Sequence, residues 1–213
     1  MKADRIAQRF DQRARRYDNP WTAFIGEREL RAIRRVIPPG VSVLDYGSGT
    51  GRTTLDLLRR GCTVTAFDIS AAMLEIAHHK ARREGLPAEF VADETKISGR
   101  VWPFITCIGV LDYYVDPVPV LRRVSGYLQP AGRLVVTFPN ALSPLAWTYA
   151  LTSRLTTQAH TCTPRRARHA AQRAGLDVVT LQHAFPALPA LGLTLVLETT
   201  FHPGRELGTG GRN

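Results

Sequence analysis

One stretch restricts the folds open to this chain more than any other: VLDYGSGTGR, residues 43–52. An apolar, strand-like run ends there in an acid, Asp45, and passes directly into three glycines that alternate with small residues. Glycine has no Cβ, so the backbone of such a loop can approach a bound ligand closely. The stretch therefore predicts a strand, a ligand-binding loop and the start of a helix.

Strand-like and helix-like segments alternate after this loop, and two helices precede it. The expected strands cover residues 41–46, 62–68, 88–93, 104–111, 133–138, 177–183 and 193–200, and the expected helices cover residues 3–17, 21–36, 53–60, 70–85, 117–128 and 163–175. Ser70 and Thr163 are placed as N-caps of two of these helices. Such alternation predicts an α/β fold with a parallel sheet and helices on both faces.

The organisation expected is a single domain over residues 1–204 with an N-terminal helical segment, residues 1–40. An apolar segment, ALSPLAWTYALTSRL, interrupts the pattern after the fifth strand, and we predict that residues 141–162 form a lid. The final residues, 205–213, are rich in glycine and predict a disordered tail.

Composition narrows the function classes. The formal net charge of +10 favours an anionic partner, although arginines spread along the chain are also typical of a solvated surface. Three scattered cysteines, Cys62, Cys107 and Cys162, form no CxxC pair and argue for a reducing, cytoplasmic location. The N-terminus carries charges where a signal peptide would be apolar, and no apolar run is long enough to cross a bilayer.

Three kinds of ligand compete for the glycine loop. A phosphate-binding Walker loop requires a lysine where this chain has Arg52 after Gly51. A dinucleotide loop requires a third glycine at the position of Arg52, and the acid before the loop would face a pyrophosphate. A ligand with an ammonium group, a ribose and an adenine but no phosphate fits these residues better.

Acids at the ends of three successive strands support that third ligand. Asp45 can accept from an ammonium group, directly or through water. Asp68 ends the second strand, and its two oxygens suit the vicinal hydroxyls of a ribose. Asp93 ends the third strand, where the adenine amino group would lie.

These glycines and acids together resemble the class I methyltransferases that use S-adenosylmethionine, and the resemblance covers residues 10–198. It implies a Rossmann-like, doubly wound sheet of seven strands whose last strand is antiparallel. The stretch RFDQRARRYD resembles the lead-in of small-molecule members in quinone, biotin and tetrapyrrole biosynthesis, in which a tyrosine at the position of Tyr17 lies over the cofactor. The expected cofactor-binding residues are Tyr17, Asp45, Gly47, Gly49, Gly51, Asp68, Ile69, Asp93, Glu94 and Leu111.

The methyl acceptor should lie beyond the carboxyl ends of the fourth and fifth strands. The residues expected to contact it are Tyr113, Tyr114, Asn140, Trp147 and Tyr149. His160 and Asp112 are the candidate general bases, unless the transfer needs none. Oxygen, nitrogen and carbon all stay open as the accepting atom.

Metal use is not expected. Asp112 and Asn140 follow the fourth and fifth strands, where catechol-type members of the family hold magnesium. The usual third carboxylate is missing, because Pro139 precedes Asn140.

Two other functions stay open: methylation of RNA or another nucleic acid, and a cofactor-binding scaffold without activity. Base-amino methylases carry an Asn/Asp-Pro-Pro-aromatic run after the fourth strand, and this chain has LDYYVDP there. The type with a cysteine nucleophile needs that cysteine after the fourth or fifth strand, whereas Cys107 lies inside the fourth. We therefore expect a small-molecule acceptor, either anionic or bound to a carrier protein, no nucleic-acid partner and no integral membrane segment. A homodimer is an open alternative to a monomer.

Overall fold

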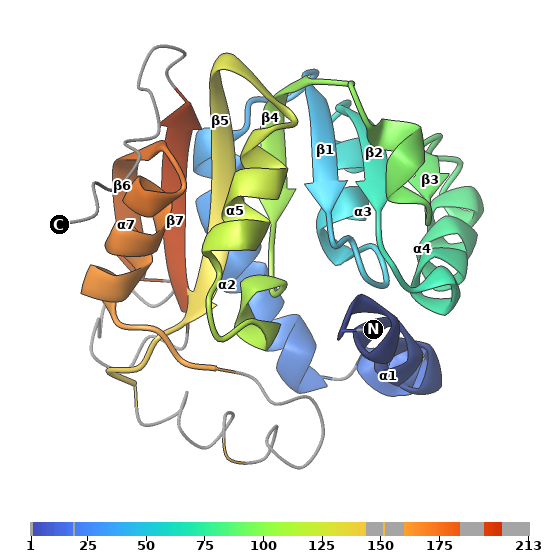
Figure 1. Ribbon diagram of the computed structural model, residues 1–213. Coiled ribbons are helices and arrows are strands. Elements are labelled where there is room, and N and C mark those ends of the chain that lie inside the picture. The colour runs from blue at the N-terminus through green and yellow to red at the C-terminus, as the bar shows by residue number, and fades with distance from the viewer. Residues whose placement is uncertain (1, 19, 144–150, 152–159, 184–193, 202–213) are drawn as a thin grey trace, which may run out of the picture.

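The computed structural model describes residues 2–18, 20–143, 151, 160–183 and 194–201, and in that part seven strands form one sheet (Figure 1). The strands are β1 (Ser42–Tyr46), β2 (Thr63–Phe67), β3 (Glu89–Val91), β4 (Trp102–Cys107), β5 (Leu128–Pro139), β6 (Leu176–His183) and β7 (Thr194–Phe201). They lie in the order β3-β2-β1-β4-β5-β7-β6. The order reverses between β1 and β4, which is where an open α/β sheet binds its ligand.

Strands β1 to β5 run parallel, and β7 is antiparallel to both of its neighbours. The central strand β1 explains this arrangement from its sequence, because Val43 and Leu44 are both fully buried, one on each face. Apolar residues on both faces are what a parallel strand covered by two layers of helices requires. The predicted seven-stranded sheet with its antiparallel last strand is confirmed.

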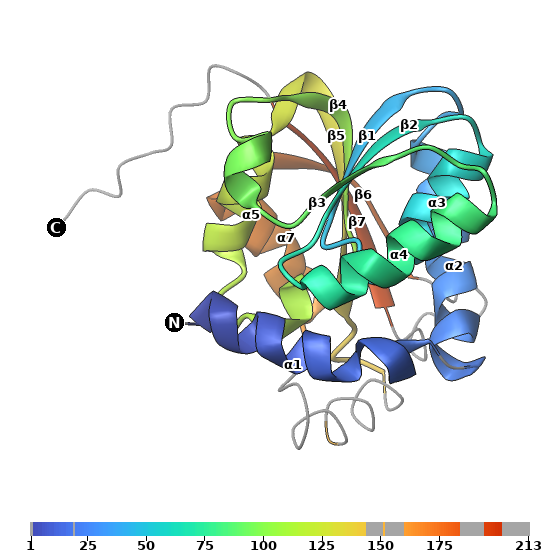
Figure 2. The ribbon, with the colours of Figure 1, turned by 90° about the vertical axis from the view of Figure 1, so that its right-hand side faces the viewer.

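Helices cover both faces of the sheet and one of its ends (Figure 2). They are α1 (Lys2–Tyr17), α2 (Pro20–Val36), α3 (Arg52–Arg59), α4 (Ala71–Arg83), α5 (Val118–Ser125) and α7 (Pro164–Arg173), with short 3-10 turns η1 (Glu94–Ile97) and η2 (Leu111–Tyr113). Helices α2, α3 and α4 lie on one face and α5 and α7 on the other, while α1 crosses the carboxyl end of the parallel strands (Figures 1 and 2). Each face has its own apolar core.

Two predicted caps are present. Ser70 Oγ accepts from Met73 N at the start of α4, and Thr163 Oγ1 accepts from Arg166 N at the start of α7. Each bond satisfies a backbone N–H that the first turn of the helix leaves without a partner.

Strand β5 begins earlier than the sequence predicts. We expected the preceding helix to run to Leu128, and Pro130 and Gly132 to end it. Instead, α5 ends at Ser125, and Leu128 already pairs with Trp102 of β4. The sheet accommodates the extra residues as an irregularity between Trp102 and Phe104, and Ala131 adopts a φ of 60°. Pairing with β4 therefore sets the start of β5, although the local turn residues predicted a later start.

Several predicted features lie outside the described residues. These are most of the lid, with Trp147 and Tyr149, the proline-rich loop between β6 and β7, and the tail. Within the described part, no helix combines the length and the apolar character that a membrane crossing needs.

Candidate functional site

The three glycines of the loop after β1 have different surroundings, although all three have positive φ angles of 80°, 54° and 88°. A Cβ on Gly47 would collide with Val110, and one on Gly51 would lie 2.8 Å from the Cβ of Ala77. A Cβ on Gly49 would meet nothing within 4 Å. Close packing of the loop therefore requires glycine at Gly47 and Gly51, whereas Gly49 presents its backbone to open space.

Asp68, at the end of β2, lies against this open position. One carboxylate oxygen accepts from Gly49 N and the other from Ser70 N, both at 2.8 Å. Burial raises the pKa of Asp68 to about 6, and the two peptide N–H groups oppose that rise. A carboxylate oxygen has more than one acceptor site, so this side chain can still bind a pair of ligand hydroxyls.

Asp45 is buried beneath the loop instead of facing the ligand space. Only 1% of the residue is exposed, and its oxygens accept from Thr54 Oγ1 at 2.6 Å and Thr106 Oγ1 at 2.7 Å. Burial raises its pKa, and the two hydroxyls counter the rise. The two threonines hold the carboxylate beneath the loop, and its contact with an ammonium group, directly or through water, stays a prediction.

The acids after β3 have structural partners. Asp93 is exposed and caps η1, with Thr95 N and Thr95 Oγ1 donating to one of its oxygens. Glu94 accepts from the hydroxyls of Tyr46 and Tyr127 at 2.9 and 3.0 Å and forms an ion pair with Arg123. These partners fix the Glu94 side chain, and the expected cofactor contacts of both Asp93 and Glu94 stay predictions.

The apolar residues predicted to touch the cofactor lie at two depths. Ile69 is half-buried and packs against the core on the α5 and α7 face. Leu111 is 2% exposed and contributes to the wall of a second, larger pocket described below. Neither residue lines the pocket around Gly49, and their predicted cofactor contacts stay predictions.

Helix α1 is tied across the glycine loop by polar contacts. Asp18, just after the helix, accepts from Thr50 Oγ1 at 2.8 Å and from Lys80 Nζ at 2.6 Å. Within the helix, Asp11 accepts from Ser70 Oγ at 2.5 Å. These bonds join the N-terminal segment to the glycine loop at Thr50 and to α4 and its N-cap.

Tyr17 is the side chain that α1 adds to the site. Burial raises its pKa to about 12, and Arg52, Asp112 and Asp68 all act on it electrostatically. Tyr17 also lines a pocket of about 390 Å³ around the glycine loop, together with Gly49, Arg52, Lys80 and Ile108. The prediction that a tyrosine of the N-terminal segment lies at the cofactor loop agrees with this placement.

Sequence reasoning missed the ion pair beside this pocket. Arg52 Nη2 lies 2.6 Å from Glu29 Oε2, and Glu29 is only 6% exposed. Gly26, one turn earlier in α2, makes the room, because any Cβ there would collide with the Arg52 side chain. The sequence offered one signal for this pair. Glu29 directly precedes the apolar residue Leu30 in the helix 21–36, so it lies near the buried face of that helix.

Asp112 is a buried acid whose pKa is strongly raised. Burial, followed by the charge of Glu29, raises its pKa to about 8. Its Oδ1 atom is buried without a hydrogen-bond partner among the described residues. Its backbone carbonyl accepts from the N–H of His160 at 2.7 Å, so the structure brings the two predicted general bases together through the main chain.

The described residues that were predicted to contact the methyl acceptor lie in different surroundings. Tyr113 packs edge-on against Phe10 of α1, with ring centroids 5.2 Å apart, and Tyr114 lines the larger pocket. Asn140 is fully buried, and its amide oxygen accepts from Leu142 N at 3.1 Å. Asn140 thus fixes the turn that follows β5, and its expected contact with the acceptor stays a prediction.

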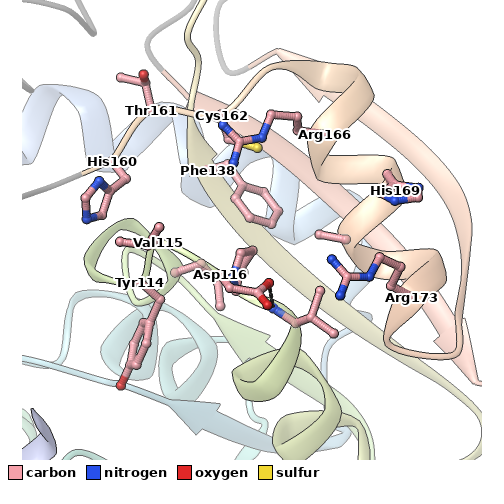
Figure 3. A pocket seen from close by; sticks show the side chains of 14 residues that line it. Tyr114, Val115, Asp116, Phe138, His160, Thr161, Cys162, Arg166, His169 and Arg173 are labelled. Carbon is pink, nitrogen blue, oxygen red and sulfur yellow. Dashed lines mark hydrogen bonds between the residues drawn. The ribbon is translucent and has the colours of Figure 1, made fainter.

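The larger pocket, of about 790 Å³, lies beside η2, whose Leu111 lines it (Figure 3). Its walls come from the loop after β4, from Phe138 at the end of β5, from His160 to Cys162, and from α7. Ligand pockets of small-molecule enzymes have volumes of this size. This pocket is thus lined by residues that follow β4 and end β5, where the methyl acceptor is expected.

Comparison with known proteins identifies the architecture. The family described as "Methyltransferase domain" matches residues 9–181. Two curated relatives are ubiquinone biosynthesis O-methyltransferases. The one from Xanthomonas axonopodis pv. citri is 27% identical over 121 residues, which are 55% of this chain and 50% of the relative. The one from Actinobacillus pleuropneumoniae serotype 5b is 31% identical over 103 residues, which are 45% of this chain and 44% of the relative. The chain thus spans about half the length of the curated relatives it matches.

A solved structure extends the likeness over nearly the whole fold. Magnesium protoporphyrin IX methyltransferase from Synechocystis PCC 6803, with bound S-adenosylmethionine, superposes with a TM-score of 0.68 at 18% identity. The match covers 94% of this chain and 97% of that chain. At this identity the superposition establishes the shared fold.

Proposed function

Because this chain belongs to the methyltransferase domain family, we propose that it transfers the methyl group of S-adenosylmethionine to an oxygen, nitrogen or carbon atom of a small molecule. The observation that carries the proposal is the open space at Gly49, bordered by Asp68 and lying in the pocket that Tyr17 lines. Phosphate-binding chemistry has no support there, since the loop is flanked by carboxylates.

The residues of this pocket fit the proposed cofactor. The Asp68 carboxylate would accept from the ribose hydroxyls, and the Gly49 backbone would lie against the ligand. Arg52 lines the pocket and would donate hydrogen bonds to the carboxylate of the amino acid while it stays paired with Glu29. When bound, S-adenosylmethionine supplies an electrophilic methyl group on a sulfonium ion.

Asp112 is our proposed proton acceptor. Its buried carboxyl has a pKa of about 8, within the range in which a general base works near neutral pH. The positive charge of a bound sulfonium would lower that pKa and so favour the ionised form. His160 lines the neighbouring pocket and stays the alternative base.

We further propose an anionic or carrier-bound acceptor, which the net charge of +10 supports. We propose a cytoplasmic location, which the free thiols of Cys62, Cys107 and Cys162 support. A homodimer is the proposed oligomeric state, and light scattering would test it. Residues 141–162 stay our predicted lid over the acceptor.

The test of the cofactor site is calorimetric titration with S-adenosylhomocysteine, followed by a labelled-methyl transfer screen over phenols, quinones, amines, porphyrins and acyl carriers. We expect Gly49→Val to abolish binding, because its side chain would fill the open space. Gly99→Val is the matched control, since Gly99 also has a positive φ and an unobstructed Cβ but lies outside both pockets. If both variants fold and bind alike, the loop is a turn and the cofactor site lies elsewhere.

A further inference from the structure

The larger pocket presents a row of nitrogen-bearing side chains from one face of α7. Arg166, His169 and Arg173 follow each other at helical spacing, and all three line the pocket (Figure 3). Residues three, four and seven positions apart lie on the same side of a helix. One continuous face of α7 therefore lines the pocket.

Their positive charge is not neutralised within the described residues. Neither Arg166 nor Arg173 takes part in an ion pair there, although Arg52, Arg100 and Arg133 do. The pocket has one carboxylate, Asp116, whose Oδ1 accepts from Val118 N at 3.1 Å. The described wall therefore carries a net positive charge.

Helix electrostatics make the position of Arg166 unusual. It lies in the first turn of α7, where the helix dipole is positive and disfavours a cation, and no acid occupies that turn. Helix stability therefore gives no reason for an arginine at this place. An anion bound in the pocket would gain from the side chain and from the dipole together.

Apolar side chains also line the pocket. Val115 is exposed, Phe138 lies at the end of β5, and Leu111 of η2 is buried. The next residue of η2 is Asp112, which acts electrostatically on Tyr17 in the cofactor pocket. Turn η2 thus contributes Leu111 to the larger pocket and lies close enough to Tyr17, which lines the smaller pocket, for Asp112 to act on it.

We propose that the larger pocket binds the anionic end of an elongated methyl acceptor, a carboxylate or a phosphate monoester on the arginines of α7 with an aromatic or acyl body against Phe138 and Val115. The inference rests on the proposed function, since it names the class of acceptor. It goes beyond that function because it assigns the binding of the acceptor's negative charge to the arginines of α7.

The experiment measures binding and transfer separately. In calorimetry, 2-naphthoate and 1-naphthyl phosphate are the charged probes and 2-naphthamide is the neutral control. We expect the preferred charged probe to bind at least about tenfold tighter than the amide, and Arg166→Gln/Arg173→Gln to weaken it about tenfold or more. The matched control is Arg165→Gln/Arg168→Gln, which removes two exposed arginines of α7 that do not line the pocket.

Transfer then ties the pocket to the acceptor. Labelled methyl should pass to a hydroxynaphthoate or a hydroxynaphthyl phosphate faster than to naphthol, and Arg166→Gln/Arg173→Gln should remove that preference while leaving S-adenosylhomocysteine affinity unchanged. Equal binding of amide and anions, equal loss in both double variants, or no binding of either anion at up to about 5 mM overturns the inference. Loss of S-adenosylhomocysteine binding in the unmodified protein would instead overturn the proposed function.

Discussion

Two buried carboxylates, Asp68 and Asp112, have different protonation equilibria because their hydrogen-bond partners differ. Two peptide N–H groups donate to Asp68 and hold its pKa at about 6 despite its burial. Asp112 lacks a partner at Oδ1 among the described residues and has a pKa of about 8. Near neutral pH the first is therefore mainly ionised and the second mainly neutral. Such a separation is common in sites that move protons.

Asp112 should make the stability of the protein depend on pH. Its pKa is raised by folding, from 3.8 to about 8, so its contribution to stability is complete below the lower value and is lost as pH rises through the higher one. We expect Asp112→Asn to stabilise the protein against urea by about one to a few kcal/mol at about pH 9 and by less at about pH 6. A difference between variant and parent that stays constant over this range would contradict the raised pKa.

Asp68 should dominate the binding of the cofactor's ribose. Asp68→Ala should weaken S-adenosylhomocysteine binding by about 1–3 kcal/mol, or about 5- to 150-fold, through loss of charge-assisted hydrogen bonds. Calorimetry checks this against Glu75→Ala, an exposed acid on α4 that lies outside both pockets. Unchanged affinity of a folded Asp68→Ala protein would remove Asp68 from the site.

At the scale of elements, α1 is the part whose position most affects the site. Its contacts run through Asp11 to Ser70 and, just beyond its end, through Asp18 to Thr50 and Lys80. The helix also packs mainly against α4, with Ala14 buried, and Phe10 contacts the ring of Tyr113. It is therefore an element that can open without disturbing the sheet.

Removing the polar ties should loosen α1 without unfolding the domain. We expect Asp11→Ala/Asp18→Ala to speed amide exchange over residues 6–18 and to raise the dissociation rate of S-adenosylhomocysteine several-fold, since Tyr17 is held in place by the helix. Exchange in β1 and β4 serves as the internal control. Faster exchange in α1 with an unchanged dissociation rate would show that the helix does not retain the ligand.

The sequence predicted the elements better than their contacts. Alternating patterns and caps such as Ser70 are local, so the order of strands and helices could be expected from them. Glu94 could not be assigned in this way, because its partners Tyr46 and Tyr127 are 48 and 33 residues away. The Arg52 and Glu29 pair joins α2 to α3 across 23 residues and was hidden for the same reason. Motif spacing located the loop, while the side chains facing it required the three-dimensional fold.

At the scale of the whole molecule, the question is whether the net charge of +10 serves a nucleic acid or a small anion. Eight of the basic side chains in the described part form ion pairs with buried or exposed acids, among them Lys80, Arg100 and Arg133. The row on α7 lines a pocket of limited volume. A pocket suits a compact anion better than an extended phosphate backbone.

Salt dependence should separate the two partners. Binding to a duplex through several phosphates would fall about 10³-fold or more between 50 and 200 mM salt, because bound counterions are released. We expect 2-naphthoate affinity to fall only mildly over the same range and labelled methyl not to enter bulk RNA. Incorporation into RNA that is lost at the higher salt would contradict the small-molecule assignment.

The position of β7 has a consequence for how the chain is made. Strand β5 pairs on one side with β7, Pro139 opposite Thr194, so that side stays open until much later residues have been synthesised. The open edge carries Val135, Val136 and Phe138, all buried in the finished sheet. Unpaired apolar strand edges recruit chaperones or associate with each other. Changes in β7 should therefore lower the yield of soluble protein during translation more than they lower the activity of the molecules that complete the sheet.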